Sequence, residues 1–225
     1  MTLSLAGRCV RTGQFGVVIS SSSPAVAARC AFVRAHAGAA CSQNITDPRL
    51  GTRVLDLLES GYSADEAIAA IVEGETLIAY RQVTAIDANG GTAAFSGERT
   101  LGLYSTARGI DAIAAGNLLA NDGVPGAMIA AFEADPGAVL ETRLVAAIRA
   151  GIAAGGEAGP VHSAGMIVAG DVEWRVTDLR VDWSDDPIEE LARLWELWQS
   201  QKADYLQRAL NPTAAPSYGV PGDPR

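Results

Sequence analysis

The chain has 225 residues, of which 48% are hydrophobic and 19% are charged, so one compact domain can bury a substantial core. Its 17 basic and 26 acidic residues give a formal charge of −9, and the basic residues are scattered along the chain, which disfavours a nucleic-acid partner. With two histidines, three cysteines without CxxC spacing and Lys202 as the only lysine, the sequence contains neither a local zinc motif nor a Walker A loop.

The cysteines and the hydropathy pattern indicate the compartment. Cys9, Cys30 and Cys41 are odd in number and lie in apolar segments, which is typical of free thiols in a reducing environment. No apolar run reaches the length of about 18 residues that a membrane helix needs, and no charged segment leads into a hydrophobic one at the start. We therefore expect a cytoplasmic protein that does not contact a membrane and that uses no metal or other cofactor.

The first third of the sequence predicts three strands followed by two helices. The strands are expected at residues 2–8, 15–20 and 37–43, and a turn at 11–14 joins the first two into a hairpin. Asp47 and Pro48 match the N-cap and first position of a helix that ends near Gly61. The capping box Ser63-Ala64-Asp65-Glu66 then begins a second helix, which runs to about residue 73.

The rest of the sequence predicts four strands, two helices, two strands and a last helix. The strands are expected at 80–87, 92–96, 102–106, 112–119, 163–169 and 173–181. The helices are expected at 125–134, at 138–153 and from Pro187 onward. Trp195 and Trp198 lie on the apolar face of the last helix, which predicts a core stripe or, alternatively, a subunit contact. Residues 1–210 should form a single domain, and the Pro, Ala, Ser and Gly content of 211–225 indicates a flexible tail.

The order of these elements predicts the fold class. Helices arrive in pairs between blocks of strands, which argues against a simple alternation of strand and helix around a parallel sheet. Two antiparallel sheets packed face to face, each covered outside by a helix pair, would bury the Ala-rich and Val-rich strands on both faces. The sequence therefore predicts an α+β fold, a four-layer αββα sandwich.

Thr2 is the first candidate for chemistry. Its small side chain permits removal of Met1, after which the threonine hydroxyl and a free α-amine would belong to one residue. An α-amine titrates near pH ~8, so it can act as a base in a chain that is poor in histidine. The alternative interpretation is an ordinary β-branched residue in an edge strand.

Short motifs in a fixed order carry a resemblance to a known family. They lie at 1–4, 42–44, 47–51, 81–83, 115–119, 154–157, 162–164 and 178–182. With them, residues 1–200 resemble the N-terminal-nucleophile (Ntn) hydrolase superfamily and, more closely, an uncharacterised bacterial family placed in that superfamily by fold. That family more often has Gly-Gly-Asp where this chain has Glu157, and Gln where it has His162. The resemblance supplies a fold and a candidate mechanism, and it names no substrate.

The resemblance implies a set of site residues. The catalytic candidates are Thr2, Asn117 and Arg81, and the substrate-binding candidates are Gln43, Gly116, Glu157 and Ser163. The Asn117 amide would stabilise an oxyanion, and Arg81 would supply positive potential where related enzymes use a lysine. The alternatives are turn chemistry for Asn117 and a solvated or ion-paired strand arginine for Arg81.

Glu157 allows three interpretations from sequence. After two glycines it could bind a substrate amine, orient the α-ammonium or be an exposed loop charge. A triad from Ser163 and His162 is excluded, because neighbours in a strand point to opposite faces. Asp178, Arg180 and Asp182 alternate on one strand, which suggests a buried ion network.

The leading hypothesis is an Ntn-type amidohydrolase that cleaves a small amide through Thr2. The alternative is a non-catalytic protein that binds a small ligand on the same αββα scaffold. In either case the partner is a small molecule, and we expect a homo-oligomer.

Overall fold

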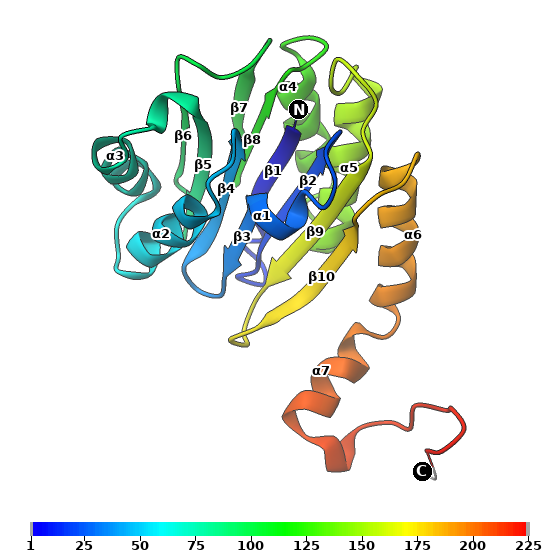
Figure 1. The fold of residues 1–225 in the computed structure, drawn as a ribbon. Coiled ribbons are helices and arrows are strands. Elements are labelled where there is room, and N and C mark those ends of the chain that lie inside the picture. Colours follow the sequence, from blue (N-terminus) through cyan, green and yellow to red (C-terminus); the bar gives the residue numbers. More distant parts are fainter. Residues whose placement is uncertain (1, 224–225) are drawn as a thin grey trace.

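The computed structural model describes residues 2–223, which form two antiparallel sheets (Figure 1). The larger sheet has the strand order β10-β9-β2-β1-β8-β7, and the smaller has the order β3-β4-β5-β6. The larger sheet consists of β1 (Thr2–Arg8), β2 (Phe15–Ser21), β7 (Ser105–Gly109), β8 (Ala112–Asn117), β9 (Ser163–Ala169) and β10 (Arg175–Val181). The smaller consists of β3 (Ala31–Arg34), β4 (Gly38–Asn44), β5 (Arg81–Asp87) and β6 (Thr92–Ser96).

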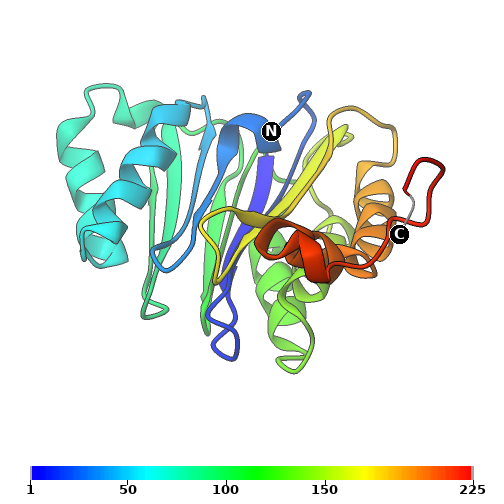
Figure 2. The same cartoon turned by 90° about the horizontal axis from the view of Figure 1, so that it is seen from below.

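Helices cover the outer face of each sheet, which gives the four-layer αββα sandwich that the sequence predicts (Figure 2). The smaller sheet is covered by α2 (Pro48–Glu59) and α3 (Ala64–Gly74), with η1 (Ile78–Tyr80) leading into β5. The larger sheet is covered by α4 (Val124–Glu133), α5 (Leu140–Ala153) and α6 (Pro187–Gln199). The helix layer on this side thus has three members instead of the expected pair, because α6 packs on β9 and β10.

Alternation along β1 shows how the layers are held. Leu3 and Leu5 are fully buried against the helices of the larger sheet. Ala6 belongs to the cluster between the two sheets, and Ser4 bonds to a residue of the smaller sheet. Successive side chains of a strand point to opposite faces, so β1 contributes to two layers at once. Since β1 has β2 and β8 as neighbours, the interpretation of Thr2 as a residue of an edge strand is wrong.

Some element boundaries differ from the prediction. The segment between the second and third predicted strands contains α1 (Ala27–Cys30) and β3, each four residues long, which is too short for a periodic pattern to be visible. The strand predicted at 102–106 begins at Ser105, because Gly102 has a left-handed φ of 62° that interrupts extended backbone. The last predicted helix is divided into α6 and α7 (Lys202–Leu210).

The carboxyl-terminal part packs through aromatic side chains. Trp195 is buried and Trp198 packs against the same core cluster, which confirms the predicted core stripe. Beyond α7, η2 (Pro212–Ala214) leads into a segment in which Arg208 donates to the carbonyls of residues 216 and 217. Residues 224 and 225 of the predicted tail lie outside the described part of the chain.

The predicted ion network on β10 is not buried. Arg180 pairs with Asp182 at 2.8 Å, and their side chains are 41% and 55% exposed. Asp178 pairs with Arg175 on the same strand, also at the surface. The sequence-based prediction of burial is wrong here, because β10 forms an edge of the larger sheet. No helix among residues 2–223 is long and apolar enough to cross a membrane.

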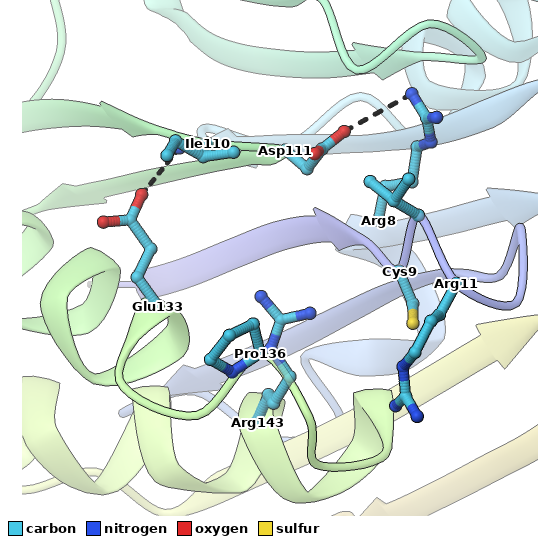
Figure 3. A pocket seen from close by; sticks show the side chains of 9 residues that line it. Arg8, Cys9, Arg11, Ile110, Asp111, Glu133, Pro136 and Arg143 are labelled. Atoms are coloured by element: carbon cyan, nitrogen blue, oxygen red, sulfur yellow. Dashed lines mark hydrogen bonds and ion pairs between the residues drawn. The ribbon is translucent and has the colours of Figure 1, made fainter.

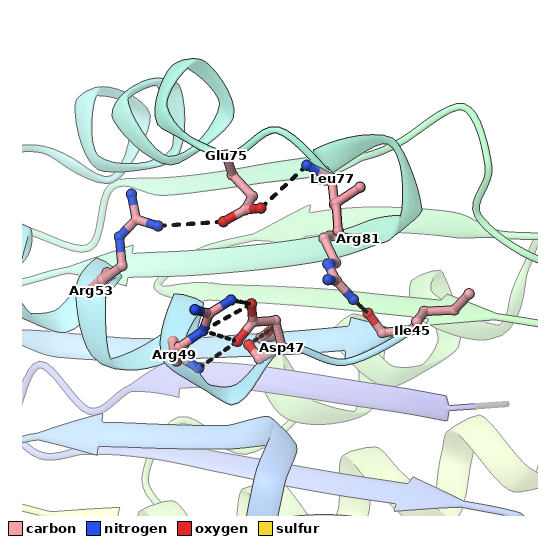
Figure 4. A network of polar contacts seen from close by, with 8 residues as sticks. Ile45, Asp47, Arg49, Arg53, Glu75, Leu77 and Arg81 are labelled. Carbon is pink, nitrogen blue, oxygen red and sulfur yellow. Dashed lines mark hydrogen bonds and ion pairs between the residues drawn. The ribbon is translucent and has the colours of Figure 1, made fainter.

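The N-terminus of α2 provides a stability prediction (Figure 4). Asp47 is buried and accepts from the backbone N–H of Arg49 at 3.0 Å, which confirms the predicted N-cap, and hydrogen bonds from the Arg49 side chain lower its pKa to about 2. Asp47→Ala should lower the free energy of unfolding by about 1 kcal/mol, measured by urea denaturation. Asp47→Asn keeps a side-chain oxygen as the cap acceptor and should lower the free energy of unfolding by less. Equal losses for the two variants would show that the charge, and not the cap, carries the effect.

Candidate active site at one end of the sheet sandwich

A row of polar side chains crosses the larger sheet at the end where β1 begins. Thr2 is the cross-strand partner of Asn117 in β8. On the other side of β1, Ser21 is next in register after the Leu3–Ser20 pair, and Ser21 is itself paired with Ser163 of β9. Side chains alternate between the two faces of a strand, so these residues lie on the same face as Ser4, which points toward the smaller sheet. Thr2 therefore heads a central strand and faces the space between the sheets.

The space between the sheets changes character along its length. In its middle it is filled by apolar side chains such as Val17, Ile19 and Ile113. At the Thr2 end the buried side chains are hydroxyls and amides: Thr2, Ser4, Ser21, Gln43, Gln82, Asn117 and Ser163. Buried polar groups are costly unless they are hydrogen-bonded, so this change marks a place where the fold retains polarity at a cost in stability.

Four of these residues, Ser4, Gln43, Gln82 and Asn117, form a connected amide network. Gln82 Nε2 donates to the Gly116 carbonyl at 3.1 Å, and a carbonyl can only accept. This contact fixes the amide orientation of Gln82, so its Oε1 must accept, from Gln43 Nε2 at 2.8 Å and from Asn117 Nδ2 at 3.1 Å. The Ser4 hydroxyl then donates to Gln43 Oε1 at 2.7 Å.

The network determines which groups of Asn117 remain available. One Nδ2–H is bonded to Gln82, which leaves the second N–H for another acceptor. Asn117 Oδ1 is buried and has no hydrogen-bond partner among the described residues. Beside Thr2, Asn117 thus offers one donor for an oxyanion and one acceptor for an ammonium or amide N–H. The alternative of simple turn chemistry does not describe its position, since Asn117 is the last residue of β8.

Glu157 lies at the same end of the sandwich. It bridges to Leu119 just after β8, and its Oε2 accepts from the backbone N–H of Ser22, just after β2. Its side chain is buried, so the interpretation as an exposed loop charge is wrong. Burial raises the pKa of Glu157 to about 7, while the positive charge of the amino terminus and the Ser22 bonds act in the opposite direction. Oε1 has no partner among the described residues.

The other predicted binding residues have structural contacts. Gly116 is buried on β8, where a Cβ would come within 2.5 Å of a Leu119 methyl group, so the Leu119 side chain would have to move to admit a larger residue. The Ser163 hydroxyl donates to the carbonyl of Ser23 at 2.6 Å and accepts from the N–H of Val26 at 3.2 Å. Ser163 therefore ties the segment after β2 to β9, and its hydroxyl is directed to that backbone.

Arg81 is not brought to this cluster (Figure 4). On β5, Gln82 faces the larger sheet, so its neighbour Arg81 faces the helix layer, where it donates to the Ile45 carbonyl. Its role in catalysis stays a prediction from sequence, with no contact to Thr2 or Asn117 to support it.

Sequence reasoning missed the central member of the network. Gln82 lies in the motif at 81–83, directly after the predicted site residue Arg81. The alternation of side chains along a strand could have identified it. Val83 packs in the core cluster under the helices, so its neighbour Gln82 points to the opposite face, toward the other sheet. Among residues 2–223, no group of three or more His, Cys, Asp or Glu side chains could hold a metal ion.

Two antiparallel sheets packed face to face between layers of helices define the class of the protein, an αββα sandwich. Within it the chain belongs to the family described as "Family of unknown function (DUF1028)", whose model matches residues 2–191.

The chain is similar to solved structures. The crystal structure of protein SPO2555 from Silicibacter pomeroyi, of the same family, is 29% identical with a TM-score of 0.84, covering 92% of this chain and 90% of that one. Anbu (ancestral beta-subunit) from Yersinia bercovieri is 10% identical with a TM-score of 0.39, covering 91% of this chain and 97% of that one. No curated protein matches the chain.

Proposed function

We propose that the protein is an amide hydrolase that acts through Thr2 once Met1 has been removed. The observation that carries the proposal is the position of Thr2: it faces the polar end of the intersheet space as the cross-strand partner of Asn117. A nucleophile there lies beside an amide that has one N–H and one carbonyl oxygen still to satisfy.

The reaction uses groups of this chain alone. The Thr2 α-amine takes the hydroxyl proton, and the alkoxide attacks the carbonyl carbon of the amide substrate. The second Nδ2–H of Asn117 donates to the oxyanion that forms. Collapse of the tetrahedral intermediate breaks the C–N bond, and the leaving amine takes the proton from the α-ammonium. The acyl group remains bound to Thr2 as an ester. Water, activated by the same α-amine, hydrolyses this ester and restores the hydroxyl.

Glu157 supports the cationic form of the amine. Its carboxyl lies at the end of the sandwich where β1 begins, and a carboxylate there favours the charged form of an ammonium group nearby. With a pKa of about 7, the carboxyl is partly ionised at neutral pH and can hold the α-ammonium that forms during attack. In this role Glu157 is a positioning residue.

One observation favours a second function, binding without catalysis. Asn117 Oδ1 and Glu157 Oε1 are both buried acceptors without a hydrogen-bond partner among the described residues. A small ligand with N–H donors, such as an ammonium or amide group, would satisfy these acceptors, and such binding needs neither a free α-amine nor the Thr2 hydroxyl.

The test is the intact mass of protein purified from its native host, before and after exposure to a β-lactone that acylates N-terminal threonine. The proposal expects loss of Met1 followed by a single adduct on Thr2. Thr2→Ala is the matched control, because alanine also permits removal of Met1 and keeps the α-amine but lacks the hydroxyl. Its acylation should be slower by at least about a thousandfold, while Thr2→Ser should retain it.

Two results would contradict hydrolysis and favour the binding function. One is a mass that retains Met1. The other is a processed Thr2 that reacts no faster than the alanine variant.

A further inference from the structure

A cavity of about 410 Å³ lies at the opposite end of β1 from Thr2 (Figure 3). Its walls come from the segment after β1, from the turn between β7 and β8, and from α4, α5 and their connection. A seven-residue strand rises about 3.3 Å per residue, so roughly 20 Å separates the two places. The volume is within the range of small-molecule sites. The proposed hydrolysis makes no use of this cavity.

Arg143 is the unusual member of the lining. It is only 8% exposed, its Nε donates to the Phe132 carbonyl at 3.0 Å, and its guanidinium carbon lies 3.8 Å from the centre of the Phe132 ring. None of the ion pairs among residues 2–223 includes Arg143. Burial lowers the pKa of this guanidinium, while Asp111 and Asp135 act in the opposite direction. Figure 3 places the guanidinium at the centre of the lining residues.

The other charges around the cavity do not neutralise Arg143. Asp111 pairs with Arg8 at 3.3 Å, and Glu133 accepts from the backbone N–H of Ile110 at 2.6 Å. Arg11 donates to the Ala138 carbonyl at 3.1 Å and has no carboxylate partner among the described residues. Asp135, which also acts on Arg143, accepts from the backbone N–H of Gly137 at 3.0 Å. None of these three carboxylates forms an ion pair with Arg143.

The remaining walls are apolar. Val10 and Ile110 are 65% and 76% exposed, and Pro136 lies beside Arg143. Exposed aliphatic side chains around a buried cation suit a ligand with an anionic head and a hydrocarbon body. Asp111 and Glu133 favour a single negative charge on that ligand, because a dianion would be repelled more strongly.

We propose that this cavity is a binding site for a small monocarboxylate with an aliphatic or aryl body. The carboxylate pairs with the Arg143 guanidinium, Arg11 adds positive potential, and the body packs against Val10, Ile110 and Pro136. A planar carboxylate matches the two terminal NH₂ groups of a guanidinium, and it would give Arg143 the direct ion pair that it lacks among residues 2–223.

Calorimetric titration with sodium 4-phenylbutyrate and sodium octanoate, each beside its uncharged primary amide, tests the proposal. We expect at least one carboxylate to bind and its amide to bind about tenfold more weakly or worse, because the charge-assisted bond is lost. Inorganic phosphate should not compete. The proposal is overturned if neither carboxylate binds at millimolar concentration, or if acid and amide bind equally.

Variants locate the site. Ile110→Glu places a carboxylate at the mouth on an exposed side chain, so the protein should fold and lose affinity for the carboxylate by about tenfold or more. Leu210→Glu, the same kind of change at a 59% exposed position on α7, should leave the affinity unchanged. Arg143→Met should abolish binding, with its fold checked by circular dichroism.

Cys9 provides a second readout, independent of the variants. It lines this cavity and is 2% exposed, so its alkylation requires local opening of the cavity wall, which a bound ligand would oppose; Cys30 and Cys41 are buried elsewhere. Bound carboxylate should slow alkylation of Cys9 by iodoacetamide, measured by peptide mass mapping, and leave the other two cysteines unaffected. The proposed site is wrong if the carboxylate still binds to folded Ile110→Glu protein and does not slow the alkylation of Cys9, because the ligand then binds elsewhere. Thr2→Ala should bind the carboxylate as the wild type does, so this test and the acylation test fail independently.

Discussion

Gln82→Leu should lower the free energy of unfolding by about 4 kcal/mol, more than an average core substitution. The side chain is fully buried, and leucine would fill most of its volume. Three groups would lose their partner together: Gln43 Nε2, Asn117 Nδ2 and the Gly116 carbonyl. Each buried group left unsatisfied costs about 1–3 kcal/mol, so the sum is several kcal/mol. Chemical denaturation monitored by tryptophan fluorescence measures it.

Ser96→Ala is the matched control for this network. It removes one acceptor of Gln82 Nε2 and leaves the three buried contacts in place, so it should cost about 1 kcal/mol or less. If Gln82→Leu lowers the free energy of unfolding by less than about 1 kcal/mol, water must reach Gln43 and Asn117 and replace the lost hydrogen bonds.

Glu157→Gln should stabilise the protein at pH above 7, with a gain that disappears in acid. The folded pKa of about 7 lies above the ordinary value of 4.5, so the native state binds the proton more tightly than the unfolded state. The stability supplied by the protonated carboxyl is fully present below pH 4.5 and is lost as the pH rises to about 7. The full difference is about 3 kcal/mol. Glutamine is neutral throughout and keeps an acceptor for the Ser22 N–H.

Unfolding free energies of wild type and Glu157→Gln, measured in steps from acid to mildly alkaline pH, check this. The advantage of the variant should grow between pH 4.5 and 7 and then stay constant. Glu66→Gln is the control, because the pKa shift of Glu66 has the opposite direction: hydrogen bonds from Ser63 lower it. Its replacement should therefore give no stability advantage that grows with pH. A constant difference for Glu157→Gln across the whole range would contradict a buried carboxyl that takes up a proton on folding.

The sequence predicted the parts of the fold that local rules determine. The capping box at Ser63 and the N-cap at Asp47 are present, because both depend on neighbours in the chain. The αββα order followed from grouped helices and alternating strands. The segment of α1 and β3 was missed because tertiary pairing with β4, and not periodicity, makes it a strand.

The candidate site was predicted in part. Thr2 and Asn117 are brought together by strand pairing, and Glu157 joins the same end through a bridge that no local pattern encodes. Arg81 faces the helix layer because its neighbour Gln82 faces the other sheet, a consequence that alternation alone could have supplied. The burial of Glu157 could not be read from its glycine-rich context, since it depends on residues distant in sequence.

The position of β1 in the larger sheet has a mechanical consequence. Both of its edges are hydrogen-bonded, to β2 and to β8, over nearly its full length. Sliding the strand along its axis would break both ladders, and a slip of one residue would exchange its polar and apolar faces. The strand therefore acts as a stiff spacer between the Thr2 end and the Arg143 cavity. Each end can change its side chains and its ligand without altering the geometry of the other, so one β-strand can carry two separately adjustable sites.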